Sequence, residues 1–588
     1  MDKFLLTSAE RSNFRLTGRS DEVDALCQAF TARWPEMVRS FIYGHSAEGR
    51  PLRGLIASRC GTLSASGLRS RKIPVLMLQA GIHPGESDGK DAGFIALREL
   101  LSTSPGLGLL DHVALLFVPA FNVDGHERFG RWNRPNQNGP EETGWRTTSQ
   151  NLNLNRDYTK AEAPEMQAML GLINEWDPLV CADLHVTDGA DFEPDVSFQV
   201  EPVNQGDPRL RAIGLELRNE LIAELASQGS IPLPFYPDLV EADNPASGFM
   251  LTIYSPRFST GYFPQRNRFT VLVETHSWKP YATRIRVTRN TIWGLAKLVA
   301  NHGATWLRAA HEADIAASEL GGTEVALDYA AGWREPMPAG HEAAAAQSGA
   351  TETIEFRGYA YRREPSPISG ILVTTYDPAT PQIWKVPFRN RAATSLVVTA
   401  PRGGYAVPPG YAEAIGAKLS HHGIEFTRLP AARRFPDTRS FRATNAQFSP
   451  GPFEGRMRAS IDGAWHEEPV ELGTGTLIVP IAQARARLLM ALLEPKAPDS
   501  FLSWGFFNAC FEQKELMEPY VAEKIAQQML TSDAALRTSF NRRLSDEPIF
   551  AASPSARLDF FLRRHASWDD RYMRYPVLRL ESALVRPA

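Results

Sequence analysis

The chain has 588 residues and a formal net charge of -4, with 43% hydrophobic and 22% charged residues. This composition is typical of a soluble globular protein, and the length predicts two or three domains rather than one core. The charge gives no electrostatic reason to expect nucleic acid or an anionic membrane as a partner, and no stretch approaches the length of a membrane span.

The chain start and the cysteines bear on cellular location. The first eleven residues contain no apolar run long enough for a signal peptide. The four cysteines are widely spaced and form no paired metal or redox motif. These features favour a cytoplasmic protein, although removal of a signal peptide would leave the same sequence. Nothing in the sequence indicates an oligomeric state.

The first third of the chain alternates between predicted strands and helices. Residues 21–40 have the apolar spacing of a helix, and short strands are expected at 41–43 and 55–57. The apolar run Val75 to Leu78 is typical of a buried strand; it breaks at Gly81, and His83 and Glu86 follow directly. The elements expected next are a helix at 91–101, a strand at 113–121, a long loop at 126–160, a helix at 163–176 and a strand at 178–187.

The pattern continues to about residue 305. A helix is expected at 207–227, a Pro- and Gly-rich loop at 229–267, a strand at 268–276 and a closing helix at 284–302. Four apolar strands therefore end in polar side chains, at His83 and Glu86, at Asn122 and Asp124, at His185, and at Glu274 and His276. Sites in open α/β sheets form at the carboxyl ends of strands, so we expect these side chains to converge.

Beyond residue 305 the pattern changes. Residues 351–480 consist mostly of short alternating runs between Gly, Pro and Asp turns, which indicates a β-rich domain. We predict an α/β domain at 1–305 with a mixed sheet flanked by helices, then a linker at 306–350, a β-rich domain at 351–480, and a helical or irregular segment at 481–588 that packs on the rest. Helices are expected within this last segment at 482–494 and 511–531.

His83 and Glu86 together suggest a metal site. Zinc binds neutral histidine and carboxylate, and a catalytic zinc site has three protein ligands with one position open to water. A His-x-x-Glu sequence alone is common by chance, so the interpretation needs further groups at other strand ends. The third ligand and a general base would have to come from elsewhere in the chain.

The order of these motifs resembles the zinc carboxypeptidase family, the carboxypeptidase A-like metallopeptidases. The resemblance covers roughly residues 20–305. It rests on four stretches of sequence: Gly81-Ile-His-Pro-Gly-Glu86, Asn153-Leu-Asn-Arg-Asp157, Asp183-Leu-His185 and Val273-Glu-Thr275.

The resemblance implies a role for each matching residue. One Zn²⁺ per chain would be held by His83, Glu86 and His185, with Glu274 as general base and proton shuttle. Asn155 and Arg156 would bind the terminal carboxylate of a peptide substrate, since an arginine fork forms two parallel hydrogen bonds to a carboxylate.

Two roles are less closely defined by the motifs. For the arginine that polarises the scissile carbonyl, Arg134 is our prediction, with Arg131 and Arg146 as competitors. For the tyrosine that closes over substrate, Tyr254 and Tyr262 both remain candidates. At the position where the family often has an aspartate directed onto a ligand histidine, this chain has Asn153, which would make that histidine a less basic ligand.

We therefore expect a zinc-dependent carboxypeptidase that hydrolyses the C-terminal peptide bond of peptides. A zinc amidase on the same scaffold, acting on cell-wall peptides or side-chain-linked amides, is one alternative. A non-catalytic binding module is another, but such a module would not need Glu274.

Overall fold

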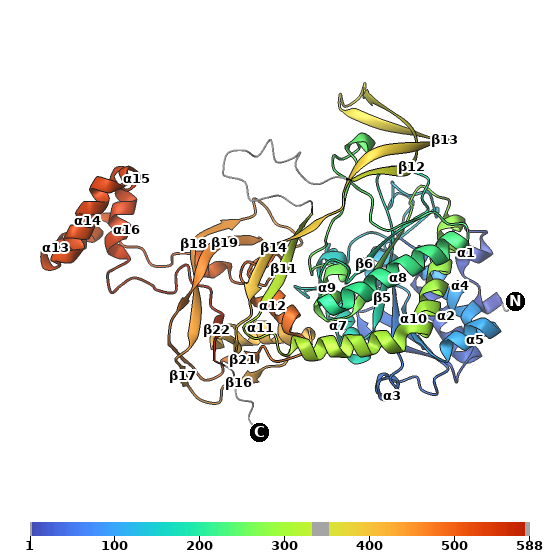
Figure 1. Ribbon diagram of the computed structural model, residues 1–588, viewed down its shortest axis with the longest axis horizontal. Helices are drawn as coiled ribbons and strands as arrows, with labels where there is room; N and C mark the ends of the chain where they lie inside the picture. The colour runs from blue at the N-terminus through green and yellow to red at the C-terminus, as the bar shows by residue number, and fades with distance from the viewer. Residues whose placement is uncertain (1–2, 332–351, 583–588) are drawn as a thin grey trace.

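An eight-stranded mixed sheet is the centre of the N-terminal domain (residues 3–317) in the computed structural model, which describes residues 3–331 and 352–582 (Figure 1). The strand order is β1-β2-β4-β3-β5-β10-β6-β7. The four central strands β4, β3, β5 and β10 run parallel, and β1, β2 and β6 add antiparallel pairings. The strand bounds are β1 Val38–His45, β2 Pro51–Ala57, β3 Val75–Ala80, β4 Ala114–Val118, β5 Val180–Val186, β6 Val196–Glu201, β7 Pro232–Leu233 and β10 Phe269–Thr275.

Helices cover both faces of this sheet. Alternate side chains of β3 point to opposite faces, so Leu76 and Leu78 belong to one core and Val75 and Met77 to the other. The first core also contains residues of α2 (Ser20–Arg33), α4 (Asp88–Ser102), α8 (Pro208–Ser227) and α10 (Tyr281–Ala317). The second core contains residues of α7 (Pro164–Trp176) and α9 (Ser259–Gln265). The remaining helices of this domain are η1 Lys3–Leu5, α1 Ser8–Arg11, α3 Ala65–Ser70, α5 Ser104–Leu110, α6 Val123–Glu127, η2 Leu154–Arg156 and η3 Pro245–Ser247.

The C-terminal half (residues 324–331 and 352–582) is built on a six-stranded sheet of order β16-β21-β15-β22-β18-β19. Its strands are β15 Gly404–Val407, β16 Thr427–Arg428, β18 Thr438–Phe448, β19 Ala459–Glu467, β21 Leu477–Pro480 and β22 Leu578–Leu580. Two smaller pairings join β11 (Glu324–Ala331) to β14 (Ala392–Thr399) and β17 (Arg433–Phe435) to β20 (Val470–Leu472). The helices α11 (Pro409–His421), α12 (Ala486–Leu493) and η5 (Asn508–Phe511) complete this region.

A long hairpin, β12 (Glu352–Pro365) and β13 (Leu372–Arg389), joins the N-terminal domain rather than the six-stranded sheet (Figure 1). β13 pairs with β9 (Phe249–Met250), and β9 pairs with β8 (Asp238–Leu239). Phe356 and Trp384 of the hairpin pack in one cluster with Phe192, Phe235 and Phe249 of the N-terminal domain. Residues 351–480, which we expected to form one domain, are therefore divided between two sheets.

The last helices form a cluster of their own. α13 (Pro519–Ser532), α14 (Ala534–Asp546), α15 (Pro548–Ala552) and α16 (Pro554–Leu562) surround a small core centred on Phe550, Phe560 and Phe561. In Figure 1 this cluster projects away from the rest of the molecule. We expected residues 481–588 to pack on the rest of the chain, and these helices differ from that expectation because they bury their aromatic side chains against one another.

The two halves share one continuous hydrophobic core. The cluster on the α7 face of the sheet continues into Tyr405, Leu419, Phe501 and other residues of the C-terminal half. Trp504 is fully buried, and its indole N–H donates to Thr159 Oγ1 at 3.0 Å. The C-terminal half is therefore joined to the first domain through apolar burial as well as polar contacts.

The predicted fold class, a mixed sheet with flanking helices followed by a β-rich part and C-terminal helices, is confirmed. α10 continues to Ala317, beyond residue 305 where we expected the first domain to end. Of the linker expected at 306–350, residues 332–350 lie outside the described residues. Among the described helices, none is both long and apolar enough to cross a membrane.

His422 joins the two halves and makes stability depend on pH. Its Nε2 donates to the Thr159 carbonyl at 2.9 Å, and its Nδ1 lies 3.0 Å from the Tyr262 hydroxyl, so the neutral ring is satisfied on both sides. Burial lowers the pKa of His422 to about 3. An unfolded histidine titrates near pH 6.5, so below that pH the unfolded chain binds a proton that the folded chain does not.

We predict that the folded state loses about 1.4 kcal/mol per pH unit from this histidine as the pH falls below about 6.5, with no such loss above it. Urea unfolding of the native chain and of His422→Asn between pH 5 and 8 measures the difference. The variant should be less stable at pH 8, and its stability should fall less steeply toward pH 5. Parallel pH profiles for the two proteins would contradict the prediction.

Candidate metal centre

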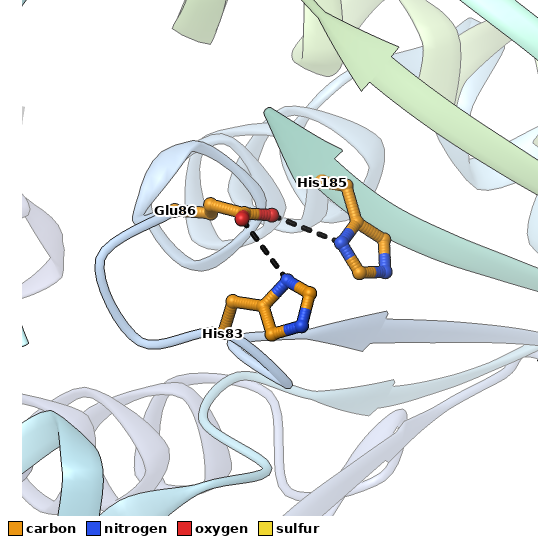
Figure 2. A group of neighbouring side chains, drawn as sticks. All are labelled: His83, Glu86 and His185. Carbon is orange, nitrogen blue, oxygen red and sulfur yellow. Dashed lines mark hydrogen bonds and ion pairs between the residues drawn. The ribbon is translucent and has the colours of Figure 1, made fainter. Parts of the chain in front are cut away.

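Three potential metal ligands meet at the carboxyl ends of β3 and β5 (Figure 2). Gly81 begins the turn out of β3 with φ of 68°, and a Cβ atom there would lie 3.3 Å from the Cα of Ala120. Glycine is favoured by both constraints. The turn closes with the Glu86 N–H donating to the His83 carbonyl at 2.9 Å, which directs both side chains toward His185.

Both imidazole rings direct their Nδ1 atom toward Glu86. His83 Nδ1 lies 3.0 Å from Glu86 Oε1, and His185 Nδ1 lies 2.9 Å from Glu86 Oε2. On their far sides, His83 Nε2 lies 3.1 Å from Asn153 Oδ1, and His185 Nε2 lies 3.1 Å from Asp183 Oδ1. The Asn153 acceptor favours a proton on His83 Nε2, which leaves the lone pair of His83 Nδ1 facing the carboxylate. Such a donor set fits a divalent cation such as zinc.

The electrostatics of the three groups differ. Burial lowers the pKa of His83 to about 4, although Glu86 acts in the opposite direction. Burial also disfavours the charged forms of Glu86 and His185, but neighbouring groups shift both pKa values in the opposite direction. His83 and Arg134 hold the pKa of Glu86 well below its ordinary value, and Asp183 raises the pKa of His185 well above it. A cation bound between these groups would compete with a proton for the His185 ring.

Glu274 lies beside this group. It is the direct register partner of His185 across the parallel strands β5 and β10, so both side chains point to the same side of the sheet. Its Oε2 atom is buried and has no hydrogen-bond partner among the described residues. Burial, together with the nearby charges of Glu86 and Asp188, raises the pKa of Glu274 to about 8. A buried carboxylate with a free oxygen and a raised pKa is a candidate proton acceptor.

These groups open into one cavity of about 260 Å³, the site cavity. Asn155 and Arg156, at the end of the long loop, both line it. The Arg156 guanidinium donates to the Asn155 carbonyl and lies 4.3 Å from the Phe258 ring centre. Burial and the neighbouring Arg146 and Arg257 lower its pKa to about 10. An arginine in such a cationic group is suited to receive an anion from a ligand.

The prediction that Arg134 polarises the scissile carbonyl requires a correction. Arg134 does not line the site cavity: it lies behind Glu86, with its Nη1 3.1 Å from Glu86 Oε1 and its Nη2 donating to the Val186 and Thr187 carbonyls. Its hydrogen bonds hold it there, so it orients Glu86 rather than facing a substrate. Arg146, one of the two competitors, lines the cavity with its Nη1 3.5 Å from Glu86 Oε1.

The tyrosine alternatives also separate. Tyr254 lines the site cavity, and its ring packs 4.8 Å from that of Phe258. Tyr262 is fully buried in the core between the two halves, where its hydroxyl contacts His422, so it does not reach the site.

Some lining residues were not predicted from the sequence. They are Val186, Asp188, Tyr236, Phe258, Ser259, Thr260 and Leu272. Asp188 follows His185 by three residues, which is a signal that could have been used. Tyr236 comes from the Pro- and Gly-rich loop, where no periodicity indicates which side chains point inward.

Residues 23–192 match the family model described as zinc carboxypeptidase. A protein called Carboxypeptidase 2 from Trichophyton rubrum is 22% identical over 467 residues, 78% of each chain. Carboxypeptidase 2 from Trichophyton tonsurans is 27% identical over 137 residues, covering 23% of this chain and 25% of that protein.

Solved structures are similar over about half of the chain. A metallo-carboxypeptidase from Pseudomonas aeruginosa, in complex with (2-guanidinoethylmercapto)succinic acid, has a TM-score of 0.35 at 18% identity, over 48% of this chain and 69% of that one. A metallo-carboxypeptidase from Burkholderia cenocepacia has a TM-score of 0.35 at 16% identity, over 47% and 68%. The family match confirms the resemblance to zinc carboxypeptidases predicted from the sequence motifs.

Proposed function

We propose that this chain, which carries a zinc carboxypeptidase segment, is a zinc-dependent carboxypeptidase that hydrolyses the C-terminal peptide bond of peptides. The observation that carries the proposal is the content of one cavity: three converging metal-ligating side chains, a buried carboxylate with a free oxygen, and the pair Asn155 and Arg156. A binding module would have no use for an unpartnered buried carboxylate, since such a group is costly to maintain.

The metal would be held by His83, Glu86 and His185. A zinc ion in this position supplies a nucleophilic water at neutral pH and polarises the scissile carbonyl. The protein contributes the orientation of its ligands. Asn153 lies at hydrogen-bond distance from His83 Nε2, and Asp183 and Arg134 form ion pairs with His185 and Glu86.

Glu274 would take the proton from the attacking water on its free Oε2 and return it to the amine that leaves. Its register with His185 across β5 and β10 supports this role, and burial favours the protonated form that the second transfer needs. One carboxylate can therefore serve both proton transfers.

The substrate would be held at its free carboxylate by Arg156 and Asn155, with Tyr254 and Phe258 beside it. Arg146 would donate to the carbonyl oxygen as negative charge develops there. The small cavity volume suits a single side chain at the end of a peptide.

The test is cleavage of a library of peptides that vary at the last residue, each with a free carboxylate and as its C-terminal amide. We expect zinc-dependent release of the last residue from the free-acid peptides only. An amidase for side-chain-linked or cell-wall amides would instead release products from branched substrates and leave linear peptides intact. No cleavage of any peptide by the zinc-loaded protein would overturn the proposal.

Arg146→Ala should lower kcat/KM by roughly 10²-fold, because removing one donor to a developing oxyanion typically has an effect of that size. Arg131→Ala is the matched control: it removes an exposed arginine of the same loop and should change kcat/KM less than about twofold. Steady-state kinetics on one cleaved peptide compare the two. Equal effects would contradict the assignment of Arg146.

A further inference from the structure

The loop that carries Asn155 and Arg156 depends on a single residue, Asn153. Its Oδ1 accepts from the Asn155 N–H at 2.9 Å and lies 3.1 Å from His83 Nε2. Its backbone carbonyl accepts the Arg156 N–H at 2.9 Å. The position of both predicted substrate-binding residues, and of one predicted metal ligand, therefore follows that of Asn153.

Asn153 is itself held by the C-terminal half. Its backbone N–H donates to Glu454 Oε2 at 2.8 Å, across 301 residues of sequence. Glu454 lies in the loop between β18 and β19, residues 449–458. Arg456 of this loop forms an ion pair with Glu162, in which its Nε lies 2.9 Å from Glu162 Oε1. The loop 449–458 therefore contacts both ends of the segment 153–162.

The backbone at Glu454 supports a role for its side chain. Glu454 has φ of 50°, a left-handed conformation that is unfavourable for a residue with a long side chain and is usually taken by Gly or Asn. The next residue, Gly455, has φ of 77°. A glutamate at a position that would favour glycine indicates that its carboxylate is needed there.

A second carboxylate of the C-terminal half acts in the same way on the other substrate-facing segment. Asp499 is buried, and its Oδ2 accepts the backbone N–H of Arg257 at 2.9 Å. Its Oδ1 lies 3.1 Å from the Arg257 guanidinium. Arg257 immediately precedes Phe258, and the Tyr158 N–H donates to the Arg257 carbonyl at 3.4 Å, which links the two segments.

We propose that the C-terminal half positions the substrate-carboxylate subsite. Glu454 fixes Asn153, and with it Asn155 and Arg156, while Asp499 fixes the segment that carries Tyr254 and Phe258. Glu454 and Asp499 are positioning residues, because their contacts are to backbone and to neighbouring side chains. The inference rests on the proposed function for its kinetic consequence, but its structural consequence can be measured separately.

The first test uses Glu454→Gly and Glu454→Gln in the full chain. The glycine variant removes the carboxylate and suits the left-handed backbone, so it should fold with little change in Tm. KM for a cleaved free-acid peptide should rise about tenfold, the usual effect of losing one hydrogen bond to a charged group, while kcat changes less than about threefold. The glutamine variant keeps a hydrogen-bond acceptor but not its charge. Its KM should lie between those of the native chain and Glu454→Gly. Glu467→Gln, an exposed carboxylate on β19 paired with Arg439, is the matched control and should leave KM unchanged.

The second test is hydrogen–deuterium exchange, without substrate, of the native chain, of the same variants and of Asp499→Asn. The amides of Asn155 and Arg156, which donate to Asn153, should exchange faster in Glu454→Gly, and residues 252–258 should do so in Asp499→Asn. If the native chain cleaves no peptide, the proposed function fails, yet faster exchange still upholds the positioning. Unchanged exchange at Asn155 and Arg156 in Glu454→Gly, or an unchanged KM in an active enzyme, overturns it.

Discussion

Glu274→Gln is expected to lower kcat by about 10³-fold or more while the zinc content stays near one per chain. General acid–base groups typically contribute roughly 10²–10⁴-fold, and this carboxylate would serve both proton transfers. The amide has almost the same volume and cannot accept the proton. Because Glu274 is not among the three converging ligands, its replacement should leave the metal in place.

The measurement is single-turnover hydrolysis of a cleaved peptide, with metal analysis of the same sample. Asp188→Asn is the matched control, since Asp188 is another carboxylate that lines the site cavity. It should retain turnover within about tenfold, because its charge only adds to the environment of Glu274. If Asp188→Asn showed the large loss of turnover and Glu274→Gln the small one, the base would be Asp188.

His185→Ala is expected to abolish both zinc binding and peptidase activity. Loss of a residue that only orients a ligand typically weakens metal binding by about 10–100-fold, so loss of a ligand should do more. The substitution also removes the imidazole between Asp183 and Glu86, which leaves two buried carboxylates without their shared partner. The variant should therefore be less stable in the metal-free state.

Zinc content after dialysis against a weak chelator tests this prediction, with circular dichroism as the check on folding. His126→Gln is a suitable control: His126 is also buried, but its Nε2 contacts the Gly18 carbonyl and it is not one of the three converging ligands. That variant should keep its zinc. Full zinc occupancy in His185→Ala would show that the ligand assignment is wrong.

The sequence by itself was sufficient for the centre of the site. His83, Glu86, His185 and Glu274 stand at the ends of apolar runs, and parallel strands bring their carboxyl ends to one edge of a sheet. That inference needs only local periodicity and a general rule of sheet topology. Asn155 and Arg156 were predicted from the resemblance to zinc carboxypeptidases rather than from periodicity, and both line the site cavity.

Only the tertiary structure decided among residues in the loops. Arg134 and Arg146 belong to one loop without periodicity, so nothing local indicates that one lies behind Glu86 and the other faces the cavity. Tyr262 was a reasonable candidate by sequence position, but α9 turns it into the core toward His422. The direction of a side chain in irregular backbone depends on contacts that are distant in sequence.

The same reason applies most strongly to the C-terminal half. Its β-rich character could be predicted, since alternation is a local property. The division of residues 351–480 between two sheets, the separate cluster of α13–α16 and the approach of Glu454 to Asn153 could not. The first and the last result from packing between segments distant in sequence, and a pattern read along one segment contains no information about its distant partner. The helices α13–α16 pack on one another, and nothing along their sequence indicates that they stand apart from the rest.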